Sequence, residues 1–318
     1  MDIGLWVLLG AGILLACVCI VIIITTVYFF VFTIHRKPTA TLENNIGANT
    51  DWYRHMDLIS ECRQWLNQQK AEDVFIRSDD GLRLHATLIK NESESKKTVI
   101  CFHGYTSCST NDYVALSRFY YEHGFNLLLV DERAHGQSEG KYIGFGVLDR
   151  KDALRWIGYA IELFGDDSII FLHGISMGAA TVLMTSGLDL PDNVRTIVAD
   201  CGFTSAYDVF SHILRRDYHI PKFPIMNLTD LLTKTFAGYG YKDVSTIDEV
   251  AKTNVPIIFI HGDKDDFVPT YMSEQNYKAC ASDKQLLIIE GADHAEAYYV
   301  NQTVYENAIV TFMDKYAK

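Results

Sequence analysis

Short apolar runs recur along most of the chain, and each is followed by a glycine, a histidine or a charged residue. Such runs are typical of buried strands. They lie at residues 98–102, 126–130, 169–172, 196–199, 255–260 and 285–289. Nearer the N-terminus, residues 74–76 and 84–88 flank the turn sequence Asp79-Asp80-Gly81, which predicts an antiparallel hairpin.

Helical patterns separate several of these strands. Residues 112–122, 147–164 and 299–316 are predicted helices. The second of them carries apolar residues at 148, 154, 157, 161 and 164, and it ends at Gly165. Alternating strands and helices predict an α/β fold, with a mostly parallel central sheet and helices on both faces.

The N-terminal residues 3–34 carry no charge. This run exceeds the roughly twenty apolar residues that cross a bilayer, so we predict one transmembrane helix with the lipid bilayer as its partner. A signal peptide is the alternative. However, it would need a positively charged start, whereas Asp2 is the only charged side chain before the run, and the run is too long for a signal peptide. The sequence Leu14-Leu15-Ala16-Cys17 resembles a lipoprotein cleavage box, yet the apolar run continues well beyond it.

The charges after this run predict which side of the membrane the rest of the chain occupies. Arg36 and Lys37 follow the run, and the positive-inside rule therefore favours the cytoplasmic side. The cysteines outside the run agree, because their odd number and wide spacing suit neither a disulfide framework nor a zinc site. They are Cys62, Cys101, Cys108, Cys201 and Cys280.

Residues 35–72 are expected to link the membrane anchor (1–34) to an α/β domain (73–318). Within this linker, Trp52, Met56, Ile59, Cys62 and Leu66 recur at helical spacing. The resulting amphipathic helix has two possible positions, on the membrane surface or packed against the domain.

Composition narrows the class of partner. Of the 318 residues, 48% are hydrophobic, which suffices for one large domain with an appendage. The formal net charge is −12, and no basic stripe interrupts it, so we expect no nucleic-acid partner.

The strand at 169–172 leads into the chain's most informative motif, Gly174-x-Ser176-x-Gly178, and small residues then open a helix. This strand–turn–helix context is the one that a nucleophile elbow requires. Glycines before and after Ser176 let strand and helix approach closely while the hydroxyl remains accessible. The N–H of Met177, at the start of the helix, is a candidate oxyanion donor. The alternative is a tight turn with a solvated serine.

Two later strand ends supply partners that an activated serine needs, a base and an acid. The loop after residue 260 contains Asp263, Asp265 and Asp266. Of the 11 histidines, His294 follows the strand at 285–289 and a glycine-containing turn, which lets its loop lean over Ser176.

An earlier strand end supplies a second oxyanion donor. His103-Gly104-Tyr105 follows the strand at 98–102, and the glycine permits a tight bend. We expect the N–H of Tyr105 to face the oxyanion, whereas a plain strand terminator is the alternative.

From about residue 73 onward the chain resembles the bacterial membrane-anchored α/β-hydrolases of the serine-aminopeptidase-like group. The motifs that carry the resemblance are 102–105, 131–138, Gly174-x-Ser176-x-Gly178 and the Asp265/His294 pair, in that order. One departure is Ala134, where the wider superfamily commonly has glycine.

The resemblance implies an α/β-hydrolase fold and a serine hydrolase mechanism. The family pattern selects Asp265 as the acid, because it lies three residues after a glycine and three before Val268-Pro269. The chain order serine, acid, histidine selects His294 as the base of Ser176. No metal or organic cofactor is expected.

The resemblance also gives a role to residues 206–246, which fit no strand–helix unit. In this fold such an insertion forms a helical cap over the site, although helices packed on the sheet edge are an alternative. Its aromatic residues favour an apolar substrate group. They are Tyr207, Phe210, Tyr218, Phe223, Phe236, Tyr239 and Tyr241.

We therefore expect a carboxylesterase-like enzyme that cleaves small-molecule esters through an acyl-enzyme. A peptidase acting on short peptides is the nearest alternative, but it needs an acidic cluster, and Asp208, Asp217 and Asp230 are dispersed. A non-catalytic binding protein on the same fold is a further alternative, although such proteins usually lack a triad member.

Overall fold

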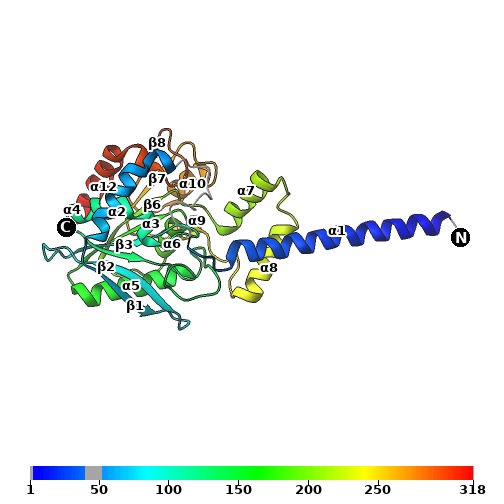
Figure 1. Ribbon diagram of the computed structural model, residues 1–318, viewed down its shortest axis with the longest axis horizontal. Helices are drawn as coiled ribbons and strands as arrows, with labels where there is room; N and C mark the ends of the chain where they lie inside the picture. Colours follow the sequence, from blue (N-terminus) through cyan, green and yellow to red (C-terminus); the bar gives the residue numbers. More distant parts are fainter. Residues whose placement is uncertain (1–2, 40–51, 318) are drawn as a thin grey trace.

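A computed structural model describes residues 3–39 and 52–317 of the chain. They form an eight-stranded sheet in the order β1-β2-β4-β3-β5-β6-β7-β8 (Figure 1). The strands span Ala71–Arg77 (β1), Arg83–Ile89 (β2), Lys97–Phe102 (β3), Asn126–Val130 (β4), Ile169–Ile175 (β5), Val194–Asp200 (β6), Ile257–Gly262 (β7) and Lys284–Ile289 (β8).

The sheet is mostly parallel, as the alternation of strands and helices predicts. Strands β1 and β2 form the predicted antiparallel hairpin, and β2 pairs antiparallel with β4. Every other pairing in the sheet is parallel. The α/β-hydrolase fold predicted from the sequence is therefore confirmed.

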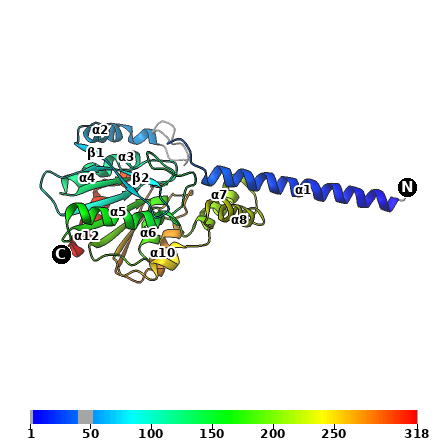
Figure 2. The ribbon, with the colours of Figure 1, turned by 90° about the horizontal axis from the view of Figure 1, so that it is seen from below.

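Helices cover both faces of this sheet (Figures 1 and 2). The helices after residue 52 span Met56–Asn67 (α2), Ser109–Asp112 (α3), Val114–Glu122 (α4), Asp149–Phe164 (α5), Met177–Thr185 (α6), Ala206–Tyr218 (α7), Ile225–Ala237 (α8), Thr246–Val250 (α9), Tyr271–Ala279 (α10), Ala297–Val300 (α11) and Gln302–Tyr316 (α12). A short 3-10 turn, Trp52–His55 (η1), precedes α2.

The central strands are continuous apolar runs because both of their faces are buried. In β4, Leu127 and Leu129 pack into the core on the side of α2 and α4, whereas Leu128 and Val130 pack into the core on the side of α5. Alternate residues of one strand thus stabilise two separate layers.

Three predicted helices differ from the observed ones at their N-terminal ends. The helix predicted at 112–122 is divided at Tyr113 into α3 and α4, and the one predicted from 147 begins at Asp149. The helix predicted at 299–316 is divided at Asn301, whose side chain accepts a hydrogen bond from the N–H of Val304 and caps α12. These boundaries depend on local capping geometry, which the spacing of apolar residues does not predict.

Helix α2 packs on the domain, which was one of its two expected positions. Its residues Ile59, Cys62 and Leu66 are buried in the same apolar cluster as Phe119 of α4. The amphipathic face is therefore buried against the sheet layer of the described domain.

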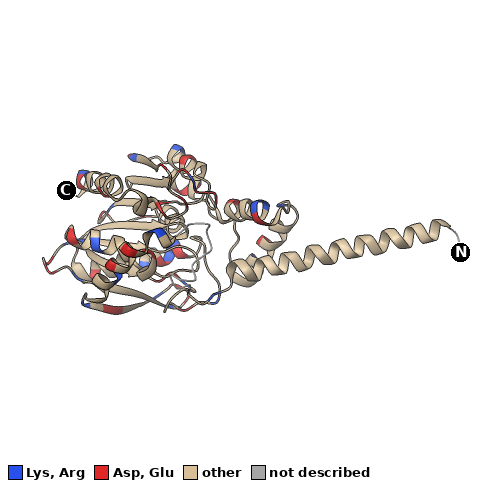
Figure 3. Cartoon of the chain, turned by 45° about the horizontal axis from the view of Figure 1, so that its top comes forward, with Lys and Arg blue, Asp and Glu red and all other residues tan. Residues whose placement is uncertain are grey.

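The first helix, Ile3–Ile34 (α1), projects away from the domain (Figures 1 and 2). By length and composition it is able to cross a membrane, a property that signal sequences share. It is free of acidic and basic side chains, whereas the α/β domain carries both signs of charge (Figure 3).

The C-terminal end of α1 is packed against the domain. Its buried residues are Thr26, Phe29, Phe30, Thr33 and Ile34. Helix α8 lies beside this end, and α7 and α8 together form a lobe on the side of the domain from which α1 extends (Figure 1). This lobe coincides with the insertion expected at 206–246.

Candidate active site

Ser176 occupies a sharp turn between β5 and α6. Its backbone has φ 54° and ψ −110°, a strained conformation for a residue with a side chain. Added Cβ atoms would collide with the carbonyl of Gly178 at position 174 and with the carbonyl of Phe102 at position 178. Glycine is therefore required on both sides of Ser176 for strand and helix to approach this closely.

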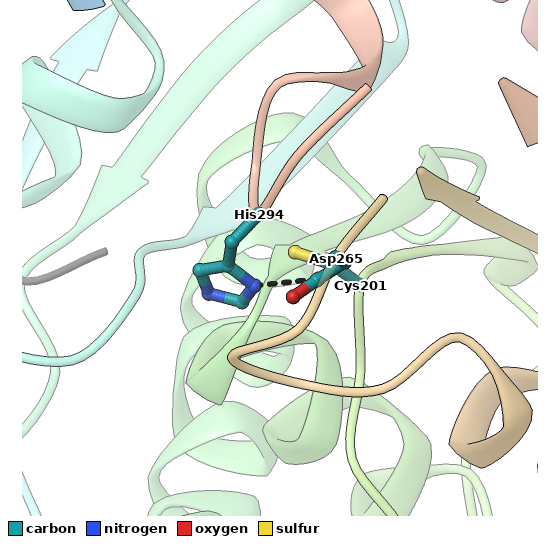
Figure 4. A group of neighbouring side chains, drawn as sticks. All are labelled: Cys201, Asp265 and His294. Carbon is teal, nitrogen blue, oxygen red and sulfur yellow. Dashed lines mark hydrogen bonds and ion pairs between the residues drawn. The ribbon is translucent and has the colours of Figure 1, made fainter. Parts of the chain in front are cut away.

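His294 lies between Ser176 and Asp265. Its Nε2 atom is 2.9 Å from Ser176 Oγ, and its Nδ1 atom is 2.7 Å from Asp265 Oδ2. Asp265 lies in the loop after β7 and His294 in the loop after β8, so residues far apart in the sequence meet at the carboxyl end of the sheet (Figure 4). The structure thus brings together the three residues that the sequence selects, in the geometry of a serine–histidine–acid triad.

Asp265 is held by four hydrogen-bond donors. One carboxylate oxygen accepts from His294 and from Nε2 of His261, at 3.0 Å for the latter. The other oxygen accepts from the backbone N–H groups of Phe267 and Val268. Burial raises the pKa of a carboxyl, but His294 and His261 hold the pKa of Asp265 well below its usual range. Asp265 is therefore ionised and fixed in place.

The pKa of His294 is raised. Burial by itself lowers the pKa of an imidazole, but the negative charge of Asp265 outweighs burial, and Asp200 and Asp293 add to its effect. The ring of Phe267 packs against the imidazole with 4.9 Å between centroids. The three carboxylates therefore favour the protonated form of His294.

The two other acids of this loop have different partners. Asp263 accepts a hydrogen bond from the N–H of Gly291 at 2.6 Å, and Asp266 pairs with Arg216 at 3.0 Å. Only Asp265 of these three contacts His294 in the described structure, which agrees with the selection made from the family pattern.

Asp200 is a buried carboxyl beside the triad that the sequence analysis missed. It ends β6, and its backbone carbonyl accepts from the N–H of Ser176 at 2.8 Å. Its side chain accepts from the phenol of Tyr305 at 2.8 Å, and burial raises the pKa of Asp200 to about 6. Its position at the carboxyl end of a parallel strand was the only signal in the sequence.

The loop after β3 lies directly over Ser176. The side chain of Asp112 fixes this loop by accepting from the N–H of Gly104 at 2.6 Å and from the hydroxyl of Ser107. An added Cβ at Gly104 would lie 3.5 Å from Ser176 Cβ. Glycine at this position therefore keeps the space above the serine open.

The two predicted oxyanion donors flank this space. Met177 is the first residue of α6, where a helix has N–H groups without intrahelical acceptors. Tyr105 follows Gly104 in the loop above, and both residues line the same cavity as Ser176. Their role as oxyanion donors stays a prediction.

The side chain of Tyr105 connects this loop to the N-terminal helix. Its phenol lies 3.0 Å from the carbonyl oxygen of Phe32 and 2.9 Å from that of Thr33, and these two acceptors share its single proton. These carbonyls belong to the last turn of α1, where acceptors lack intrahelical partners. The sequence contains no local signal for this contact.

A cavity of about 600 Å³ surrounds Ser176 and His294. Such a volume is typical of a site for a small organic ligand. Apolar side chains of α7 and of the last turns of α1 form much of its wall. Among them are Phe29, Phe32, Val209, Phe210, Ile213 and Tyr218.

The cap contributes fewer aromatic residues to this cavity than expected. Of the predicted residues, Phe210 and Tyr218 line it. Phe223 and Phe236 are 71% and 58% exposed and lie outside the cavity wall, so the expectation that they contact a substrate is wrong. The cap residues of the cavity wall all come from α7, whereas Phe223 precedes α8 and the ring of Phe236 in α8 lies 5.7 Å from the ring of Phe30 of α1.

Cys201 lies beside the His294–Asp265 pair (Figure 4). Its sulfur and one donor atom from each of these two residues lie within 4.8 Å of one another. Burial raises the pKa of the Cys201 thiol well above its usual range, whereas a metal binds the thiolate. Because His294 and Asp265 already bind each other, the group fits a packed triad and does not fit a metal centre.

Comparison with known proteins shows the family to which this chain belongs. Residues 97–224 match the family model of the alpha/beta hydrolase fold. The uncharacterized protein YqkD of Bacillus subtilis is 30% identical over 221 residues, which cover 70% of this chain and 72% of YqkD. The chain belongs to the α/β-hydrolase family.

Solved structures with esterase names share the fold. The Pyrococcus furiosus esterase Pf2001 superposes with a TM-score of 0.67 at 21% identity, covering 89% of this chain and 99% of the esterase. Est1E of Butyrivibrio proteoclasticus, solved with ferulic acid, superposes with a TM-score of 0.59 at 22% identity, covering 76% of this chain and 98% of Est1E.

Proposed function

We propose that this protein is a serine hydrolase that cleaves carboxylic esters through an acyl-enzyme on Ser176. The observation that carries the proposal is the 2.9 Å contact between His294 Nε2 and Ser176 Oγ, with Asp265 on the other ring nitrogen. Asp265 accepts the proton on Nδ1 of His294 and thereby fixes the tautomer of the imidazole. The bare Nε2 is then available to accept the proton of Ser176.

The reaction follows from this geometry. Ser176 Oγ attacks the ester carbonyl carbon as His294 Nε2 takes the hydroxyl proton, and the N–H groups of Tyr105 and Met177 bind the resulting oxyanion. The intermediate collapses as the C–O bond breaks, and His294 gives its proton to the departing alcohol. Water then attacks the acyl-enzyme with His294 again as base, which releases the acid and restores Ser176.

An ester is a better substrate than a peptide for the described cavity. The cap carboxylates that a peptide amine would need already have partners. Asp208 accepts from the hydroxyls of Thr204 and Ser205, and Asp217 pairs with Arg216. Of the cap residues in the cavity wall, only Asp217 is a carboxylate, and the others are Val209, Phe210, Ile213 and Tyr218. These features support an esterase over an aminopeptidase.

We further propose that α1 is retained as a single membrane-spanning anchor and that the α/β domain lies on the cytoplasmic side. The support is the length of the uncharged helix and the position of Arg36 and Lys37 after it. Protease added to intact cells is expected to spare the C-terminus until the cells are lysed. Digestion in sealed cells would overturn the orientation and leave the enzyme proposal intact.

The enzyme proposal is tested by labelling membranes that contain the full chain with a fluorophosphonate probe. We expect covalent labelling of the wild type and none of Ser176→Ala. Hydrolysis of p-nitrophenyl esters is then compared with hydrolysis of aminoacyl p-nitroanilides by the same preparation. Labelling combined with faster anilide cleavage would favour the peptidase, and absent labelling would contradict both.

A further inference from the structure

The anchor helix forms part of the substrate cavity. Phe29, Phe32 and Thr33 of α1 line the same cavity as Ser176. Phe29 packs edge-on against Tyr218 of the cap, with 5.1 Å between ring centroids. A helix that only tethered the domain would leave the cavity to be closed by the domain itself.

This end of α1 is held rigidly in the domain. The phenol of Tyr105 donates to the carbonyl of Thr33, and the Thr33 hydroxyl lies 2.9 Å from the phenol of Tyr241. The N–H of Ile143 donates to the carbonyl of Ile34 at 2.7 Å. Just beyond the helix, the guanidinium of Arg36 donates to two backbone carbonyls at 2.6 Å each. The orientation of the cavity relative to the anchor is therefore fixed.

The length of α1 places the cavity at the membrane surface. The helix has 32 residues and is therefore about 48 Å long, whereas the hydrocarbon core of a bilayer is about 30 Å thick. Its buried residues all lie between positions 26 and 34, and residues 3–21 are exposed on all sides of the helix. If the exposed turns of α1 cross the hydrocarbon core, its buried C-terminal end lies at the membrane–water interface. The cavity then begins at this interface.

The outer side of the cap carries the apolar residues expected of a surface in contact with lipid. Phe223, Leu231 and Phe236 are exposed. Leu231 and Phe236 belong to α8, which lies beside α1 (Figures 1 and 2). The Phe236 ring lies 5.7 Å from the ring of Phe30 of α1, so this apolar surface continues onto the anchor. Exposed apolar patches mark interaction surfaces, and the continuity of this one with an uncharged helix favours contact with lipid.

The polar boundary of the membrane falls at the level of the active site. Lys37 is the second charged residue after the uncharged helix, and its ammonium lies 3.8 Å from the centroid of the Phe32 ring. Lys37 and Ser176 line one cavity. Ester groups of lipids lie at the same boundary between hydrocarbon and headgroups.

We infer that the substrate is a long-chain monoacyl lipid ester, which enters the cavity from the bilayer with its acyl chain along the wall formed by Phe29 and Phe32. The inference rests on the ester hydrolase and the anchor proposed above, and it names their substrate class. A cavity of about 600 Å³ suits one acyl chain. Direct entry from the bilayer spares the chain the unfavourable transfer through water.

The entry route is tested with the full-length protein in phosphatidylcholine proteoliposomes that contain 1-oleoylglycerol. At a fixed mole fraction of substrate, a tenfold dilution of the vesicles is expected to leave the rate per protein unchanged, because substrate and enzyme share one bilayer. A rate that falls in proportion to dilution would show entry from water and overturn the route.

The substrate class is tested in the same vesicles. 1-Oleoylglycerol and 1-oleoyl-lysophosphatidylcholine are compared with the dioleoylphosphatidylcholine of the host bilayer. We expect faster hydrolysis of at least one monoacyl ester than of the diacyl lipid, and the preferred one identifies the headgroup. Hydrolysis of the diacyl lipid alone would overturn the single-chain assignment.

The role of α1 is tested by Phe32→Trp, with Val31→Trp as the matched control. Val31 is exposed on the same helix and is outside the cavity wall. We expect Phe32→Trp to lower the ratio of oleoyl ester to p-nitrophenyl butyrate hydrolysis by about tenfold, and Val31→Trp to leave it unchanged. Phe32→Leu is the second variant, and fluorophosphonate labelling gives the concentration of folded enzyme in each preparation. Equal ratios in all variants would remove α1 from the substrate wall.

Failure of this inference is distinguishable from failure of the proposed function. Fluorophosphonate labelling with butyrate hydrolysis, but no hydrolysis of any bilayer ester, would overturn the inference and leave the hydrolase in place. Absence of both labelling and butyrate hydrolysis would overturn the proposed function and the inference with it.

Discussion

The phenol of Tyr105 donates a hydrogen bond to the carbonyl oxygen of Thr33, at 2.9 Å. This bond joins the loop above Ser176 to the last turn of the N-terminal helix. Tyr105 is thus in contact with two parts of the proposed machinery, because its N–H is the expected oxyanion donor and its ring supports α1.

Removing this phenol should weaken catalysis without abolishing it. Tyr105→Phe keeps the backbone N–H but loses the bonds to α1, and the loss of about 1 kcal/mol corresponds to about a fivefold decrease in kcat/KM. The control is Tyr207→Phe, whose phenol bonds Asn227 in the cap. Both variants are compared with the wild type by ester hydrolysis, as full-length protein in the same detergent. Equal kcat/KM values for Tyr105→Phe and Tyr207→Phe would contradict the role of the bond.

The choice among the loop acids is tested by three single substitutions. Asp265→Asn should favour the wrong tautomer of His294 and lower turnover by about 10⁴-fold, as in another serine hydrolase. Asp263→Asn and Asp266→Asn lose only turn and surface contacts, so a decrease of roughly tenfold or less is expected. Turnover of a p-nitrophenyl ester by each variant distinguishes the three acids. An active Asp265→Asn together with an inactive Asp263→Asn or Asp266→Asn would assign the acid to that other residue.

His261 is expected to position Asp265. Its Nε2 is close to two acceptors, Asp265 and the carbonyl of Val268, so this nitrogen carries the proton and donates. His261→Ala removes a donor to a buried carboxylate and should lower kcat by about 10- to 100-fold, with little change in KM. A change confined to KM would assign His261 to substrate binding.

The pH dependence follows from the raised pKa of His294. Protonated His294 cannot accept the serine proton, so kcat/KM should fall as pH decreases through a midpoint above the ordinary histidine value of about 6.5. Asp200→Asn removes a negative charge that raises this pKa, so the midpoint should move to lower pH. A midpoint that stays in place, or rises, would contradict the assigned contribution of Asp200.

Chain-length preference should depend on Phe210 and not on Phe223. Phe210 is buried in the cavity wall, whereas Phe223 is exposed on the outer side of the cap. Phe210→Ala should change the ratio of octanoate to acetate ester hydrolysis by about tenfold or more, while Phe223→Ala preserves it. Equal effects of the two substitutions on every ester would indicate a folding role for the cap.

The fold could be predicted from the sequence because its signals are local. A strand buried on both faces must be a short apolar run, and a serine elbow must have small residues next to it. These constraints place Ser176, and chain order together with the family pattern selects Asp265 and His294 from the sequence alone. The structure then brought these three side chains within hydrogen-bond distance.

Only the tertiary structure decided which apolar residues face the substrate. Phe29 and Val31 belong to one uncharged helix, and Phe210 and Phe223 to one aromatic-rich insertion, so their sequence contexts are alike. Packing buries Phe29 and Phe210 in the cavity wall and leaves the other two exposed. The physical reason is that apolar residues gain similarly from contact with lipid, substrate or protein, so which of these contacts forms depends on how distant segments meet.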